Sequence, residues 1–152
     1  MKLGEALRLR SDNLKKVAEL RTRAVASTQI QEGEAAPESP DELLAQIERV
    51  LTETTQLIQR INRTNVATLL PDGTRLVDAL AERDACLALR APFHAVAEAA
   101  SAMQGRYLRS EIRIVRTVDP AALRKRVDEY ARRHRLIDVA IQEANWNTEL
   151  AD

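Results

Sequence analysis

The segment from Ser39 to Asn65 constrains the fold most, because it carries the most regular apolar period in the chain. One stripe repeats at alternating spacings of four and three residues, and a second set widens it on one side: Leu43, Ile47, Val50, Thr54, Leu57 and Ile61, with Leu44, Leu51 and Ile58. Such a wide stripe is typical of a helix in a bundle core, whereas a two-stranded coiled coil needs a narrower one. The segment therefore predicts a long bundle helix.

Both ends of this helix have recognisable signals. Ser39 is a good N-cap, Pro40 suits the first helical position, and Glu42 can close a capping box. Ile61 is followed by the polar residues Asn62, Arg63, Thr64 and Asn65, so we expect the helix to cover about residues 40–62.

Composition favours one mainly α domain over residues 1–152. Aromatic residues make up only 3% of the chain, so the core must consist of Leu, Ile, Val and Ala. We expect an antiparallel four-helix bundle with coiled-coil-like helices, a small β-hairpin and one extended arm. The expected elements are a helix over about 2–30, an acidic linker at 31–38, the helix at 40–62, a hairpin at 66–76, a helix over about 76–104, an arm at 107–118 and a helix over about 120–144.

Local signals place several of these elements. Pro71, Asp72 and Gly73 form a turn sequence, because proline presets φ and glycine allows positive φ. Pro92 should kink or interrupt its helix. The arm is expected to be extended because apolar and polar residues alternate along it. We expect Trp146, the one tryptophan, to fold back and pin the C-terminus.

Charge is unevenly distributed although the net charge is zero. Residues 2–23 hold seven basic and three acidic side chains, and residues 32–53 hold seven acidic and one basic. The two segments could face each other in an antiparallel hairpin with complementary surfaces, or each could be an independently solvated face.

The chain shows no signs of export or membrane insertion. Cys86, the single cysteine, cannot form an internal disulfide. The N-terminal segment lacks the apolar core of a signal peptide, and no stretch approaches the ~18 apolar residues of a membrane span. We therefore expect a cytoplasmic bacterial protein with no membrane span.

Several segments resemble one known family along most of the chain. They are MKLGEAL, QEGE, QRINRTN, PDGTRLVDALAERD, RYLRSEI, TVD and IQEANWNTEL. In this order they are similar to the septicolysin-like family of small, mostly helical, uncharacterised bacterial proteins. The resemblance implies a compact helical fold, and the family's name implies a cytolysin-like activity.

The polar residues after Ile61 are the best candidate for a ligand or anion site. Asn62, Arg63 and Asn65 could act together with Arg83 and Asp84, because a guanidinium flanked by amides can hold a carboxylate or a phosphate. Alternatively, these residues cap the helix and form a network between helices.

The two histidines suggest a second hypothesis. His94 and His134 both lie at apolar-stripe positions, Glu98 is one turn from the first and Asp138 one turn from the second. Together they could form a metal site between two helices, although zinc needs at least three protein ligands and neither pair has a zincin spacing. Alternatively, they are structural histidines.

A basic segment suggests a third hypothesis. Residues 106–135 contain ten basic and four acidic side chains, as a phosphate-binding surface would. Scarce aromatic residues and the neutral net charge argue against nucleic acid. The segment could instead be a basic rim that meets the acidic residues at 32–53, within or between chains.

The sequence contains no Walker A loop, GxGxxG, GxSxG, CxxC or HExxH motif, so it assigns no catalytic residue and no cofactor. We expect a non-enzymatic, self-associating helical interaction or scaffold protein, a homo-oligomer whose arm at 111–118 pairs with a second copy. A nucleic-acid-associated protein and a metal-dependent enzyme or cytolysin-like protein are the alternatives. The sequence names no protein partner.

Overall fold

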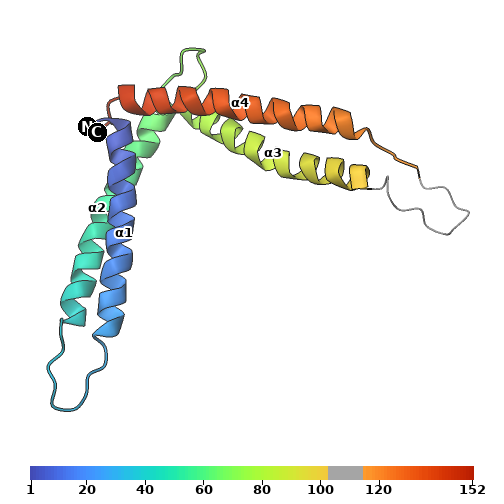
Figure 1. The fold of residues 1–152 in the computed structure, drawn as a ribbon. Helices are drawn as coiled ribbons and strands as arrows, with labels where there is room; N and C mark the ends of the chain where they lie inside the picture. The colour runs from blue at the N-terminus through green and yellow to red at the C-terminus, as the bar shows by residue number, and fades with distance from the viewer. Residues whose placement is uncertain (103–114) are drawn as a thin grey trace, which may run out of the picture. The chain divides into compact units, whose positions relative to one another are not determined.

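A computed structural model describes residues 1–102 and 115–152, and its described residues are mostly helical, as predicted. The four helices are α1 (Leu3–Ala26), α2 (Pro40–Ala67), α3 (Leu76–Ala102) and α4 (Pro120–Asn147) (Figure 1). They belong to two compact units. The first comprises residues 1–68 and 143–152, and the second comprises residues 69–142.

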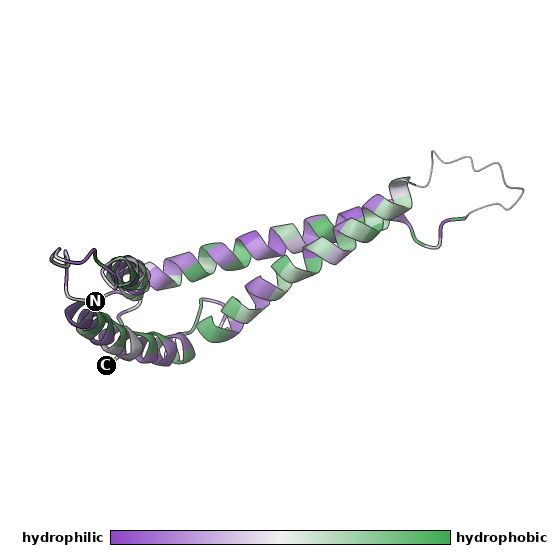
Figure 2. Cartoon of the chain, turned by 90° about the horizontal axis from the view of Figure 1, so that it is seen from below, coloured by the Kyte–Doolittle hydropathy of each residue, from purple (hydrophilic) through white to green (hydrophobic). Residues whose placement is uncertain are grey.

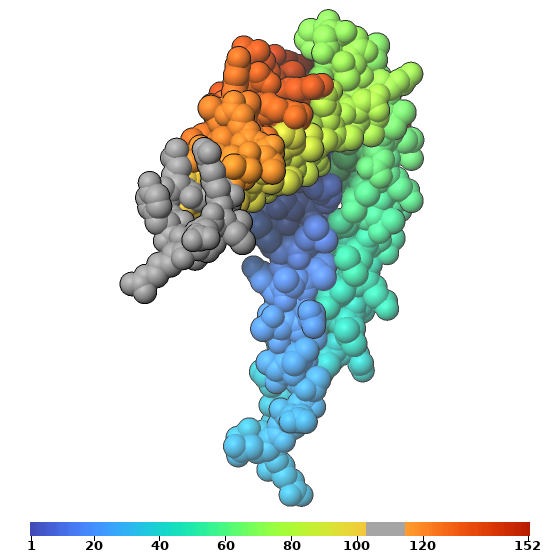
Figure 3. Space-filling view, turned by 90° about the vertical axis from the view of Figure 1, so that its right-hand side faces the viewer, coloured from blue at the N-terminus to red at the C-terminus, as the bar shows by residue number. Residues whose placement is uncertain are grey.

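The first unit is built on an antiparallel hairpin of α1 and α2, which lie side by side along their lengths (Figures 1 and 3). Ser39 caps α2 as expected, because its hydroxyl accepts a hydrogen bond from the Glu42 N–H at 3.4 Å and Pro40 occupies the first turn. The predicted stripe of α2 is largely buried, at Leu43, Val50, Thr54, Leu57 and Ile61. Near the hairpin loop, Leu20 and Ala24 of α1 pack with Leu43.

A polar contact inside this hairpin sets its register. The Asn13 amide donates to the Thr54 hydroxyl at 3.0 Å, and that hydroxyl donates to the Val50 carbonyl at 2.6 Å. Thr54 is only 2% exposed, so the hydrogen bonds offset the cost of burying its hydroxyl. Shifting one helix along the other would break the hydrogen bond between Asn13 and Thr54, so the contact favours this register.

The second unit contains α3 and most of α4, which run side by side (Figure 2). Asp119 precedes α4 and caps it as predicted, because its carboxylate accepts a hydrogen bond from the Ala121 N–H at 2.9 Å. The residues that α3 buries are mainly small: Leu76, Ala79, Cys86, Ala97 and Ala100. Such residues allow a close approach between helices.

Aromatic and charged side chains complete the contact between α3 and α4. The rings of Phe93 and Tyr130 meet edge to face at 5.4 Å, and the Arg126 guanidinium lies 4.3 Å from the Phe93 ring centre. Arg133 pairs with Glu82 near one end of the contact, and Arg124 reaches Ser101 near the other.

The predicted β-hairpin at 66–76 is wrong. Leu69 and Arg75 form one antiparallel bridge around the Pro71–Gly73 turn, and the segment contains no strand. The turn signal was sound, since Gly73 has φ of 85°. Because α2 continues to Ala67, however, too few residues remain for a ladder.

Other boundaries also differ from the prediction. α1 ends at Ala26, where Ser27 is the C-cap, four residues before Ile30. α2 includes the polar residues 62–65, and α4 extends to Asn147. Pro92 lies inside α3 without ending it. The predicted arm at 107–118 lies mostly outside the described residues, and its described part, 115–118, belongs to no helix.

Candidate functional site

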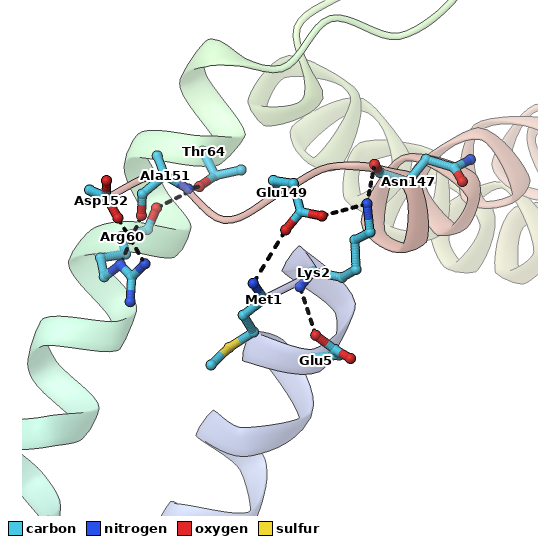
Figure 4. A network of polar contacts seen from close by, with 9 residues as sticks. All are labelled: Met1, Lys2, Glu5, Arg60, Thr64, Asn147, Glu149, Ala151 and Asp152. Atoms are coloured by element: carbon cyan, nitrogen blue, oxygen red, sulfur yellow. Dashed lines mark hydrogen bonds and ion pairs between the residues drawn. The ribbon is translucent and has the colours of Figure 1, made fainter.

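The two ends of the chain meet in the first unit and form a clasp, which we define as residues 1–5 and 145–152 together with the end of α2 (Figure 4). Its backbone contacts run in both directions. The Leu3 N–H donates to the Thr148 carbonyl and the Leu150 N–H donates to the Met1 carbonyl, both at 2.9 Å. The side chain of Leu150 is buried, so the tail is held by apolar packing as well.

Charge reinforces this backbone pairing. The Glu149 carboxylate lies 2.7 Å from the Lys2 ammonium and 3.3 Å from the Met1 amino group (Figure 4). These two cations lower the pKa of Glu149 below its usual value, the hydrogen bond from Lys2 being the largest cause. The Lys2 ammonium also donates to the Asn147 carbonyl at 3.2 Å, which satisfies a free carbonyl at the end of α4.

The end of α2 holds the last two residues. Arg60 donates through Nε to the Ala151 carbonyl at 2.8 Å, and Arg63 donates through Nε to the Asp152 backbone oxygen at 3.0 Å. The Thr64 hydroxyl accepts from the Ala151 N–H at 2.9 Å. Positions 60, 63 and 64 lie on one helix face, because residues three and four apart are neighbours there.

Trp146 lies in the clasp but only partly as expected. Its ring packs against Gly4, where an added Cβ would come within 3.1 Å of the ring and 3.2 Å of the Asn145 carbonyl. The indole is nevertheless 56% exposed. Glu149, Leu150 and the two arginines of α2 hold the tail more directly.

The clasp accounts for Arg63, one of the residues predicted to bind an anion. The Nε donors of Arg63 and Arg60 are directed at the chain's own C-terminal residues. Asn62 is exposed and Asn65 is half-buried on the same helix. Arg83 and Asp84 belong to the second unit, where they pair with each other at 2.8 Å, and Arg83 also lies 3.6 Å from Asp138. The ligand or anion site remains a prediction.

The structure does not bring the proposed metal ligands into one cluster. Within residues 1–102 and 115–152, no group of three or more His, Cys, Asp or Glu side chains could hold a metal ion. Glu98 lies 3.6 Å from Arg124, and Asp138 lies 3.6 Å from Arg83. His94 is exposed and His134 is half-buried.

The described part of the basic segment contains two groups of basic residues, one that contacts α3 and one that is exposed. Arg124, Arg126 and Arg133 contact residues of α3, as given above. The exposed Lys125, Arg132 and Arg135 share α4 with Asp128 and Glu129. Those two acids reduce the net positive charge of the exposed surface of α4.

The first unit also has an apolar surface. The sequence predicted its residues on α2 as part of the helix stripe but did not predict their exposure. Leu44 is 52% exposed, Leu51 is 41% exposed and Ile58 is half-buried, although these are the residues that widen the α2 stripe. On α1, Leu14 is 49% exposed and Leu7 is half-buried. We call these five residues the apolar face. The stripe of α2 is wider than a single neighbouring helix covers.

All five residues lie on the same side of the hairpin. Asn13 and Thr54 face each other. At about 100° per residue, Leu14 lies about 100° around α1 from Asn13, and Leu51 lies about 60° around α2 from Thr54 in the same sense. In an antiparallel pair the same sense of rotation leads to the same side. Leu7 and Leu44 or Ile58 follow at seven-residue steps.

The opposite side of the hairpin mixes charged, polar and apolar residues, among them Leu9, which is 42% exposed. Two shallow grooves run along it. One is lined by Asp12, Lys15, Lys16, Glu19, Leu20, Arg23 and Gln46, and the other by Met1, Leu9, Asn13, Glu53, Gln56, Leu57 and Arg60. The two sides therefore differ in composition: charged residues share the grooved side with apolar ones, whereas the five residues of the apolar face are all aliphatic.

Together these features define a class of protein: a helical protein of two hairpin units, one of which leaves an aliphatic face uncovered. The sequence profile of a family of unknown function (DUF6847) matches residues 10–150, and the chain belongs to that family. The assignment corrects the septicolysin-like resemblance, whose short shared segments did not identify the family. No curated protein matches the chain.

One solved structure supports the fold. It is described as the crystal structure of a functionally unknown conserved protein from Corynebacterium diphtheriae. This chain is 40% identical to that protein, the match covers 99% of this chain and 98% of the other, and the TM-score is 0.87. Among the described residues, no helix combines the length and apolar character needed to cross a bilayer.

Proposed function

We propose that the protein is a non-enzymatic interaction or scaffold protein that self-associates through the apolar face of its α1–α2 hairpin. The observation that carries this proposal is the exposure of Leu14, Leu44 and Leu51 on one side of the hairpin. Exposed apolar residues scattered singly are ordinary, but a row on one side of a hairpin is typical of an interface.

The row also has the spacing of an interface between helices. Leu7 and Leu14 are seven residues apart, as are Leu44, Leu51 and Ile58. Seven-residue spacing keeps side chains aligned along one seam of a helix, where they can interdigitate with another helix. Aliphatic side chains offer no hydrogen-bond donor or acceptor to a small polar substrate.

The alternatives have less support. The metal hypothesis needs at least three ligands, and residues 1–102 and 115–152 contain no group of three or more His, Cys, Asp or Glu side chains that could hold a metal ion. The nucleic-acid hypothesis needs a continuous basic face, and three arginines of α4 instead contact α3. The arm at 111–118 was first predicted to mediate self-association, and half of it, residues 111–114, lies outside the described residues.

Light scattering during size-exclusion chromatography tests the proposal. We expect the unmodified chain of 17.0 kDa to elute as an oligomer at micromolar concentration. Leu51→Glu should shift it towards the monomer, because a charge at a buried interface is unfavourable. Glu53→Lys, which changes a neighbouring residue on the grooved side, is the matched control and should leave the mass unchanged.

Two outcomes would contradict the proposal. An unmodified chain that remains monomeric up to about 100 μM would exclude self-association of useful strength. An oligomer that Leu51→Glu leaves intact would place the association on another surface. Circular dichroism of Leu51→Glu should show retained helix content, since the side chain is already exposed in the single chain.

A further inference from the structure

We infer that the partner of the apolar face is the same face of a second copy, related by a two-fold axis that runs parallel to the hairpin. The inference rests on the proposed self-association and specifies its geometry. In this arrangement α1 of each copy packs on α2 of the other, so the two hairpins form an intermolecular four-helix bundle. The bundle expected from the sequence would then be completed by two chains.

The size of the surface suits such a contact. α1 has 24 residues and α2 has 28, so they extend for about 36 and 42 Å at 1.5 Å per residue. Two helices of about 10 Å diameter side by side offer an area on the order of 800 Å² per copy, which is the size of a standard interface. Because the two-fold contact is closed, both copies of the interface are paired and no further copy can bind there.

Heptad spacing explains why the same face can be its own partner. Leu44, Leu51 and Ile58 form one row on α2, and Leu7 and Leu14 form one on α1. Asn13 faces Thr54, and Leu20 packs with Leu43, so Leu14 lies level with Leu51 or its neighbour. A two-fold axis parallel to the hairpin preserves these levels. The α1 row of each copy therefore meets the α2 row of the other at matching heights.

Charge selects between the two ways of stacking the hairpins. Beside the apolar row, α1 carries Arg10 and Arg21, and α2 carries Glu48 and, at its start, Asp41. None of these four makes an ion pair in the part of the chain that the structure describes. Arg21 lies level with Leu44, between the heights of Asp41 and Glu48. Packing α1 on the partner's α2 therefore brings opposite charges together.

The other two-fold axis lies across the hairpin and would pack α1 on α1 and α2 on α2. It would pack the helix that carries Arg10 and Arg21 on its own copy, and the helix that carries Asp41 and Glu48 on its own copy. Like charges across an interface are unfavourable and would slow the encounter of two copies. Both axes keep neighbouring helices antiparallel, as in many four-helix bundles, but the axis parallel to the hairpin avoids this repulsion.

Charge reversal with rescue tests the inference. We would measure dimer dissociation by sedimentation velocity at low salt for the full chain, Arg21→Glu, Glu48→Arg and the double variant. Each single change should raise the dissociation constant about tenfold or more, and the double variant should restore it to within about threefold. Lys16→Glu, the same charge change on the grooved side of α1, is the matched control and should have little effect.

The outcomes separate this inference from the proposed self-association. A chain that never dimerises contradicts both. A dimer that Arg21→Glu tightens has α1 packed on α1, and a dimer that neither single change affects uses another surface; each result overturns the inference and leaves self-association standing. Failure of the double variant to rescue would also overturn it. Thermal melting of each diluted variant should match that of the unmodified chain, since neither residue pairs within the described chain.

Discussion

The two hairpins use different residues to hold two helices together. In the α1–α2 hairpin the contact is aliphatic, with Leu43, Leu57 and Ile61 buried, and Asn13 fixes the register through Thr54. In the α3–α4 hairpin the buried residues of α3 are mainly small, and aromatic and charged contacts surround them. The first hairpin is held by large aliphatic side chains, whereas the second combines small buried residues with aromatic and charged contacts.

The difference bears on what each hairpin needs from its surroundings. The aliphatic stripe of α2 is wide enough to contact two neighbouring helices. Because α1 covers only part of it, Leu44, Leu51 and Ile58 remain uncovered as the part of the apolar face that lies on α2. The second hairpin also exposes apolar residues: Leu89 and Val96 lie seven residues apart on α3, Leu87 lies on another side of that helix, and α4 exposes Leu136 and Val139. We assign the interface to the first unit because its exposed leucines come from both helices and lie on one side of the hairpin.

The largest expected effect comes from removing volume in the first hairpin. Leu57 is 7% exposed, so Leu57→Ala should lower the free energy of unfolding by about 2–5 kcal/mol through lost burial and a cavity. Glu53→Ala, on the exposed side of α2, should change it by no more than about 0.5 kcal/mol. Chemical denaturation followed by circular dichroism measures both. Equal midpoints would refute the assigned faces.

The second hairpin should respond to the opposite change. Ala97 is fully buried, and Ala97→Leu should destabilise α3 and α4 by about 1–3 kcal/mol, because a larger side chain forces the close helices apart. Amide hydrogen exchange would locate the loss in the second unit. If Ala97→Leu were neutral, the contact would have spare room and the comparison between the hairpins would fail.

A smaller effect is expected at the register contact. Asn13→Ala removes the hydrogen bond to Thr54, and we expect a loss of about 0.5–1.5 kcal/mol. The Thr54 hydroxyl keeps its bond to the Val50 carbonyl, which limits the loss. A thermal melt checks the size. A loss as large as that of Leu57→Ala would mean that register, more than volume, governs the first hairpin.

The smallest effect concerns acid sensitivity. The pKa of Glu149 is lowered by Lys2 and the Met1 amino group, and the pKa of Glu38 is lowered by a hydrogen bond from Arg23. A carboxylate with a lowered folded pKa stabilises the fold above its unfolded pKa, and this is lost as the pH falls through the folded pKa. Acid should therefore loosen the clasp, and Glu149→Gln should reduce the pH dependence of melting. An unchanged pH profile would contradict this role.

The sequence predicted the helices better than their ends. The stripe of α2, the Ser39 cap and the Asp119 cap are local patterns, and each was correct. The residues after Ile61 suggested an end to α2 because they are polar, yet polar side chains are compatible with a helix whose exposed side they occupy. Only one bridge then remained where a hairpin was expected.

The clasp could not be predicted because its partners are far apart in sequence. Lys2 and Glu149 are neighbours only after folding, and nothing near either residue indicates the other. Arg60, Arg63 and Thr64 do share one helix face, which was the available signal for their joint role. Sequence spacing likewise could not show that Glu98 and Asp138 lie beside arginines.

The most direct test of the central claim is a set of intermolecular nuclear Overhauser effects (NOEs) in a mixed dimer. Methyl-labelled chain would be mixed with an equal amount of unlabelled chain, so that only contacts between copies are observed. The account predicts NOEs between chains at the methyl groups of Leu14, Leu44 and Leu51. A dimer whose intermolecular NOEs come only from other residues, with none from this row, would contradict it.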